Sequence, residues 1–398
     1  MFWVASLFSN TGTWVHEIGA GWLMSTLDGS PHMVAAVRAA MALPMVLLAI
    51  PAGALSDRVD RRRLMLTVQC IMMATAASIA LLTYLDRITP VGLLALTIVM
   101  GLGAVLHVPT WQATIPELVP RNHLPQAIAL GSVSFNLARS VGPALGGMLI
   151  AILGTWAAFG VNAISFAVVL LAVFLWKRTS SAPRVEESFV QSMHAGLTMV
   201  LRRGAMRQVL VRVVLFVLPA SSLWALLPLI AREQLNWNAS GYGYLVGAIG
   251  LGAVLAALWL PRLRARFGVE STLSVSMLMY AVGLALLAVT SWRSVGILAA
   301  MLAGIGWMSV MTTLNSTAQM TLPDAMRARG MSSYLSAMSM AMAGGAVIWG
   351  QFASRASLPV ALGLAAATLA IVGVGMFGVR LRQPRRPPSA PIVDVTAP

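Results

Sequence analysis

The sequence predicts an all-α membrane protein. Hydrophobic residues make up 58% of the 398 residues, charged residues only 10%, and mean hydropathy is +0.82, which excludes an ordinary soluble domain. Apolar runs of about 20 residues recur from end to end, long enough to cross a bilayer core of roughly 30 Å as helices. The runs lack apolar/polar alternation, and a helix satisfies every backbone group within one segment, so strands are not expected.

Twelve apolar runs are expected to be transmembrane helices. In chain order they cover residues 2–26, 34–56, 64–85, 90–113, 125–153, 156–176, 209–231, 241–261, 270–291, 294–317, 328–352 and 358–379. No basic segment precedes the first run, so we expect it to stay in place as a helix and not to be cleaved as a signal. Because the chain begins almost inside this helix, a start further upstream stays open.

The longest polar interval divides the chain into two pseudo-symmetric halves. We expect a six-helix bundle over residues 1–176, a cytoplasmic linker over 177–208, a second six-helix bundle over 209–380 and a disordered, Pro-rich cytoplasmic tail over 381–398. Part of the linker has apolar residues near helical spacing, which is compatible with an amphipathic helix on the membrane surface. The halves resemble each other weakly, and such internal duplication is typical of transporters that bind substrate between the repeats.

Arginine and lysine positions predict the orientation. With both termini inside, most of the 27 basic residues fall in internal loops and the tail, while the external loops hold Arg87, Arg232, Arg293 and Arg355. This bias predicts cytoplasmic ends. It also explains the net charge of +15 through anionic lipid headgroups, without nucleic acid as a partner.

Several classes of function are not supported by any motif. Lys177 is the only lysine and no GxxxxGK[ST] occurs, so no phosphate-binding loop for ATP is present. Cys70 is the only cysteine, and the five histidines show no ligand spacing, so we expect no metal site and no cofactor. No hydrolase signature is found, and we expect a protein that is not an enzyme.

The segment GALSDRVDRRR, residues 53–63, is a compact basic turn between the second and third expected helices. A glycine permits close helix packing, an aspartate at a helix end accepts hydrogen bonds, and the arginines hold the turn at the headgroups. The cluster is therefore a candidate cytoplasmic gate that latches one conformation, with a simple positive anchor as the alternative. Its candidate residues are Gly53, Asp57, Arg58, Arg61 and Arg62.

This turn resembles the G-x-x-x-D-R-x-G-R-R motif of the major facilitator superfamily, with Asp60 where the superfamily usually has glycine. In the fifth helix, Gly142, Pro143, Gly146 and Gly147 resemble the G-P-x-x-G-G core found in exporters of that superfamily. Small residues and a proline there favour close packing and a bend. The wider sequence resembles a bacterial subgroup that includes the enterobactin exporter and multidrug-efflux relatives. The resemblance implies the major facilitator fold and efflux across the bacterial inner membrane.

Polar residues inside the expected spans are the candidates for proton coupling and for the substrate cavity. A charge at the centre of a span costs at least about 2.5 to 3.5 kcal/mol, so it usually faces a cavity or a partner. Glu17 and Arg38 lie at similar depths on antiparallel helices, and we expect either a proton-exchanging pair or a static bridge. Arg139 shares one face of the fifth helix with Asn136. His16 and Asn315 are weaker candidates that also fit simple interhelical hydrogen bonding.

Together these features predict a monomeric secondary active exporter of amphipathic small molecules, drug-like or siderophore-like, driven by protons through alternating access. The polar residues within the bilayer are few, which disfavours an uptake symporter for a polar solute. A non-transporting membrane sensor or scaffold is the alternative from another class, and a flux measurement separates it from a transporter.

Overall fold

The computed structural model of the protein describes residues 1–120, 123–176, 204–322 and 327–377, and these residues form helices without any strand. The helices, in chain order, are α1 (Phe2–Leu27), α2 (Pro31–Arg58), α3 (Arg61–Tyr84), α4 (Pro90–Leu118), α5 (Leu124–Leu153), α6 (Thr155–Phe174), α8 (Gly204–Leu229), the π-helical turn η2 (Ile230–Gln234), α9 (Ala239–Val289), α10 (Arg293–Thr321), α11 (Arg327–Arg355) and α12 (Leu358–Gly375). The all-α prediction is confirmed. Residues 177–203 of the expected linker over 177–208 and the tail over 381–398 lie outside the described residues, and α8 already begins at Gly204.

Nine helices of the described ranges are long and apolar enough to cross a membrane. The expected spans 241–261 and 270–291 both lie in α9, whose 51 residues are interrupted at Gly268 (φ 80°). The break at Gly268 divides α9 into two helical segments, residues 239–267 and 269–289. At 1.5 Å per residue they are about 44 and 32 Å long, so each is long enough for one bilayer crossing of roughly 30 Å. Helices α1 and α11 are not among the nine, because each carries polar residues such as Glu17 and Gln351 along its length. The count of twelve spans stays a prediction.

Local sequence signals set many helix boundaries. Proline occupies the first turn of α2, α4, α5 and α12, where its missing N–H costs no hydrogen bond. Side-chain oxygens of Asp60, Thr89, Asn238 and Ser357 accept hydrogen bonds from backbone N–H groups in the first turns of α3, α4, α9 and α12. Short polar turns therefore separate the long apolar helices at defined residues.

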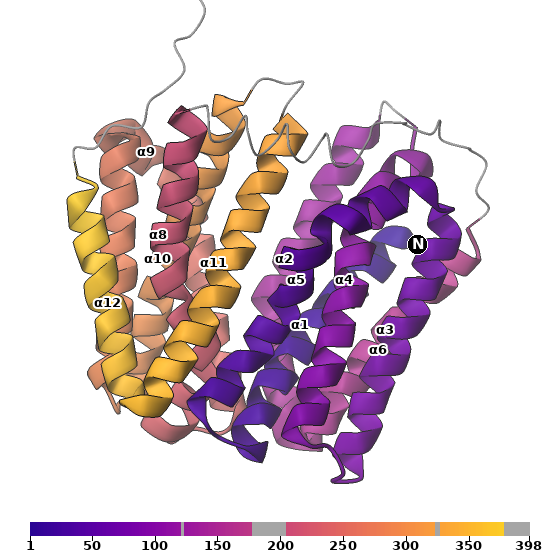
Figure 1. The fold of residues 1–398 in the computed structure, drawn as a ribbon, viewed down its shortest axis with the longest axis horizontal. Coiled ribbons are helices and arrows are strands. Elements are labelled where there is room, and N and C mark those ends of the chain that lie inside the picture. Colours follow the sequence, from indigo (N-terminus) through magenta and orange to yellow (C-terminus); the bar gives the residue numbers. More distant parts are fainter. Residues whose placement is uncertain (121–122, 177–203, 323–326, 378–398) are drawn as a thin grey trace, which may run out of the picture.

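The helices form two bundles that lie side by side, one from α1 to α6 and one from α8 to α12 (Figure 1). In the first bundle α1 packs against α5 and α6, α3 against α6, and α2 against α4. In the second, α8 packs against α11 and α12, and α9 against α10 and α12. The bundles touch mainly through α2 with α11 and α5 with α9. These four helices are therefore the surfaces on which one bundle can move against the other.

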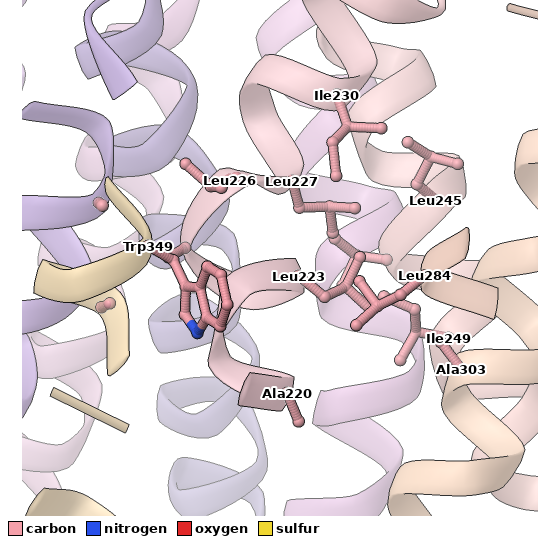
Figure 2. Close-up of a cluster of buried hydrophobic side chains, with 14 of the residues drawn as sticks. Ala220, Leu223, Leu226, Leu227, Ile230, Leu245, Ile249, Leu284, Ala303 and Trp349 are labelled. Atoms are coloured by element: carbon pink, nitrogen blue, oxygen red, sulfur yellow. The ribbon is translucent and has the colours of Figure 1, made fainter. Parts of the chain in front are cut away.

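The core of the second bundle forms around α8. Figure 2 shows Leu223, Leu227 and Ile230 grouped with residues of α9 and α10, and all of these side chains are buried. On another side of α8, the Trp349 indole N–H donates to the Leu218 carbonyl at 2.9 Å. Aliphatic packing and this bond hold α11 and α8 together. This packing and the hydrogen bond thus fix the positions of α8 and α11 within the second bundle.

One end of the interface between the bundles is tightly packed. A Cβ added at Gly350 of α11 would lie 2.5 Å from the Ala35 Cβ and 3.2 Å from the Pro31 carbonyl oxygen of α2. The His32 backbone N–H donates to Ser354 Oγ at 3.0 Å. In the adjoining turn the Asp28 carboxyl accepts from the Ser30 side chain and backbone, and these bonds lower the pKa of Asp28. The bundles are therefore in contact at the end that carries residues 28–35 and 350–354.

This contact predicts a cross-link. In a Cys70→Ser background, the pair His32→Cys and Ser354→Cys should form a disulfide on mild oxidation, because the two residues already share a 3.0 Å hydrogen bond. The measurement is the gel shift from a polyethylene glycol maleimide added after denaturation in sodium dodecyl sulfate, so that every free thiol reacts; the test pair adds the reagent twice without oxidation and not at all after it. The control pair, His32→Cys with Thr368→Cys on the exposed face of α12, should add the reagent twice in both cases. Unchanged double addition in the test pair would contradict the packing.

Candidate functional site

A cavity of about 640 Å³ lies between the two bundles. The first bundle contributes Trp14, Glu17, Arg38, Phe135 and Arg139 to its wall. The second contributes Trp224, Trp307, Asn315, Tyr334, Met338 and Met342. Aromatic, methionine and aliphatic side chains therefore make most of the surface, and a few polar groups interrupt it, as is usual for small-molecule sites. We call this space the central cavity.

Glu17 and Arg38 form an ion pair on the wall of the central cavity. Arg38 Nη1 donates to Glu17 Oε2 at 2.5 Å, and the two side chains are only 20% and 22% exposed. Both charged groups lie within helices α1 and α2, away from the helix ends, and inside a bilayer each alone would be costly. Pairing makes the two charges tolerable and holds α1 against α2 at this depth.

The ion pair also contacts the opposite bundle. The Arg38 guanidinium lies 5.9 Å from the centroid of the Trp224 ring on α8, and the Tyr242 hydroxyl on α9 lies close to Arg38. One turn beyond Glu17, Trp22 stacks on Tyr242 with ring centroids 6.3 Å apart. A change in the charge of Glu17 would therefore be felt at the interface between the bundles.

Arg139 reaches the same cavity from α5. Its guanidinium donates to the sulfur of Met308 on α10 at 3.8 Å, and a thioether is a weak acceptor. Among the described residues that line the central cavity, the charged ones are Glu17, Arg38 and Arg139. Since Glu17 is paired with Arg38, the positive charge of Arg139 is left over, and the lined surface has a formal charge of +1.

The other candidate cavity residues have different surroundings. Asn315 lines the cavity and accepts a hydrogen bond from Gln319 Nε2 at 2.6 Å. His16 is completely buried on a different face of α1, edge-on against the Phe159 ring of α6 with centroids 4.9 Å apart. Adjacent helical residues differ in direction by about 100°, so Glu17 faces the cavity and His16 does not. Asn136 lies in α5, and its side chain is outside the part of the structure that is described.

The basic turn joins helices of the first bundle. Arg61 Nη1 lies 2.7 Å from Glu117 Oε1 at the end of α4. Arg62 donates to the Val173 and Phe174 carbonyl oxygens at 3.2 and 2.6 Å, and a positive charge at the carboxyl end of α6 is favourable for the helix. The turn therefore links α3 to α4 and α6.

Three other residues of the predicted gate, Gly53, Asp57 and Arg58, lie in the last part of α2, and their side chains are outside the described set. Asp60, where the motif usually has glycine, caps α3 by accepting from the Arg63 backbone N–H at 2.9 Å. An Asp directly before a helix is a known cap signal, so this role was readable from the sequence.

The glycines of α5 pack in two directions. A Cβ added at Gly142 would lie 2.7 Å from the Trp14 Cβ, and one at Gly146 would lie 3.1 Å from the Val15 Cα, both on α1. A Cβ at Gly147 would lie 2.8 Å from the Gly243 Cα on α9, and one at Gly243 would lie 3.1 Å from the Pro143 carbonyl oxygen. This segment therefore holds α5 on α1 and brings the backbones of the two bundles into contact.

Comparison with known sequences finds one matching family profile and several related transporters. The profile of a family described as transmembrane secretion effector matches residues 1–394. The staphyloferrin A transporter of Staphylococcus aureus is 25% identical over 72% of this chain and 72% of its own length. The multidrug efflux pump Tap of Mycolicibacterium fortuitum is 23% identical over 95% of both chains. The enterobactin exporter EntS of Shigella boydii is 29% identical over 70% of this chain and 66% of its own.

Solved structures share the fold at lower identity. The nucleoside transporter NupG has a TM-score of 0.73 at 13% identity, with 95% of this chain and 98% of that one covered. A bacterial homologue of the iron transporter ferroportin has a TM-score of 0.73 at 15% identity, with 94% and 97% covered. The profile match over nearly the whole chain, the related transporters and the two-bundle architecture lead to one conclusion: the chain is a multi-pass membrane transporter that belongs to the major facilitator superfamily, in its transmembrane secretion effector family.

Proposed function

We propose that the protein is a secondary active exporter that moves amphipathic small molecules, drug-like or siderophore-like, out of the cell in exchange for protons. The observation that carries this proposal is the Glu17–Arg38 ion pair, which lines the central cavity and contacts the opposite bundle through Trp224. Relatives named as an efflux pump and as a siderophore exporter support the direction of transport.

Proton coupling follows from the chemistry of this pair. Protonation of Glu17 removes its charge, so Arg38 loses an ionic partner and keeps its contacts with Trp224 and Tyr242. Arg38 then interacts mainly with the opposite bundle. Protonation of Glu17 therefore changes the contacts between the bundles, which must rearrange in alternating access. A proton that enters down the membrane potential releases about 2.3 kcal/mol per 100 mV, enough for a roughly fifty-fold substrate gradient.

The cavity surface favours a substrate with an apolar body and an anionic or hydroxyl-rich group. Aromatic rings and the flexible side chains of Met338 and Met342 accommodate an apolar body of variable shape. Arg139 has a weak acceptor in Met308, so an anionic group in the cavity would gain a charge-assisted hydrogen bond. Asn315 adds an amide on the second bundle.

We further propose the orientation and the gates. Both termini lie in the cytoplasm of a bacterial inner-membrane protein, because the basic residues concentrate in the loops on that side. The basic turn acts as the cytoplasmic gate, with Arg61 and Arg62 holding α3 to α4 and α6. The α5 glycines form the closely packed surface on which the two bundles close at the end opposite the cytoplasmic gate. The exporter works as a monomer, with lipid, protons and substrate as its partners.

Glu17→Gln should abolish proton-driven efflux, because the amide cannot exchange a proton. The measurement is efflux of a fluorescent dye from cells that express the intact protein, with and without a protonophore. Glu233→Gln, the same change at an exposed position beyond the cavity, should keep protonophore-sensitive efflux at comparable expression.

A static bridge gives a different pattern. If the pair only pins α1 to α2, Arg38→Gln combined with Glu17→Gln should restore efflux, since neither charge is then left unpaired. Full protonophore-sensitive efflux by Glu17→Gln alone would remove Glu17 from proton coupling altogether.

Arg139→Gln should selectively weaken the binding of anionic substrates, because the variant removes the cavity charge that Glu17 does not neutralise. A charge-assisted hydrogen bond lost in a cavity corresponds to a loss of affinity of about tenfold or more. The measurement compares inhibition of efflux by a naphthalenesulfonate and by a lipophilic cation. Arg355→Gln, at an exposed helix end, is the matched control. Equal losses for both probes would contradict a charge-selective role.

A further inference from the structure

A second cavity of about 630 Å³ lies entirely within the first bundle, between α1, α4, α5 and α6. Its wall includes Ser9 and Asn10 of α1, His107, Trp111 and Gln112 of α4, and Phe135 of α5. We call it the side cavity. It is as large as the central cavity, yet the function proposed above makes no use of it.

The chemistry of the side cavity differs from that of the central cavity. None of the described residues that line it is Asp, Glu, Lys or Arg. Its polar groups are hydroxyls, amides and an imidazole, which offer both donors and acceptors to a neutral ligand. The Trp111 ring lies 5.9 Å from the His107 ring at an interplanar angle of 30°, which gives a ligand aromatic faces to stack on.

Several contacts fix this wall in place. Asn10 Nδ2 donates to Ser134 Oγ of α5 at 3.2 Å. The side chains of Gln69 and His107 are hydrogen-bonded at 3.2 Å, which sets the position of the imidazole. The Trp3 indole N–H donates to the Leu130 carbonyl at 2.8 Å and ties α1 to α5 beside the cavity. The polar groups are therefore positioned before any ligand arrives, as binding sites require.

One side chain separates the two cavities. Phe135 lines both of them, and its ring packs against Trp14 of the central cavity with centroids 6.5 Å apart. Phe135 also lies one helical turn before Arg139, so the two side chains share a face of α5. A molecule whose anionic group binds Arg139 can thus reach Phe135, and through it the side cavity, with its other end.

We propose that the side cavity is a second binding compartment, which takes the neutral, hydroxyl- or amide-bearing aromatic end of a substrate whose anionic end lies at Arg139, with Phe135 as the partition. This rests on the proposed function only in treating the central cavity as the substrate site. The substrates would be elongated molecules with unlike ends. A small anion would fill the central cavity alone.

Two anionic probes of different length test the proposal. Benzenesulfonate carries the anion alone, and 4-hydroxyazobenzene-4′-sulfonate adds a second ring with a neutral hydroxyl at mildly acidic pH. Binding to the purified full chain in detergent is measured by equilibrium dialysis, without any gradient, so the result does not depend on proton coupling. The longer probe should bind about tenfold more tightly, because it stacks in the side cavity.

Variants that fill the side cavity should remove this advantage. Gln112→Trp and Ser9→Leu place bulk in it and should bring the longer probe to the affinity of benzenesulfonate, which itself stays unchanged. Thr368→Leu, a polar-to-apolar change at the exposed face of α12, should alter neither probe.

Any of three results would overturn the proposal of a second compartment. The unmodified chain could show no preference for the longer probe, both filled variants could retain that preference, or the filled variants could lose affinity equally for both probes. Failure of the Glu17→Gln efflux experiment would end the proton-driven mechanism and leave these binding results unaffected. If Arg139→Gln does not weaken anionic probes while the filled variants still remove the preference for the longer probe, the anion does not bind at Arg139, and that part of the proposal is overturned.

Discussion

The structure depends on the rule that a polar group inside a bilayer must have a partner within the protein. Helices satisfy this rule for the backbone, and the Glu17–Arg38 ion pair satisfies it for two charged side chains. The pair joins α1 to α2 and faces α8 and α9 across the interface. A requirement of stability thus places a titratable group where the two bundles meet, and the proposed proton coupling relies on this position.

The contacts within each bundle are extensive, whereas the contacts between the bundles are of a kind that can break and form again. Within each bundle, aliphatic packing and bonds such as Trp349 to Leu218 hold neighbouring helices together. Between the bundles, the contacts at one end include a close approach at Gly350 and hydrogen bonds between His32 and Ser354. Small residues allow helices to meet closely without interlocking side chains. Such a surface can close tightly and still separate.

Much of this was predictable from the sequence, and the exceptions have physical reasons. Glu17 and Arg38 stand about equally far from the short turn between α1 and α2, so their meeting follows from helix geometry. The side to which His16 turns does not follow, because α1 is apolar on most of its surface and shows no clear inward face. Tyr242 lies more than 200 residues from Arg38 in the chain, and no local pattern marks it as a partner.

The position of α11 in the chain has a consequence for folding. Helix α11 packs on α8 of its own bundle and on α2 of the other. Helices α2 and α11 lie almost three hundred residues apart in the chain. Contacts between segments so distant in sequence form slowly, because a long stretch of chain must first be brought together. The contact between the bundles is therefore expected to form late in folding, after the local packing within each bundle.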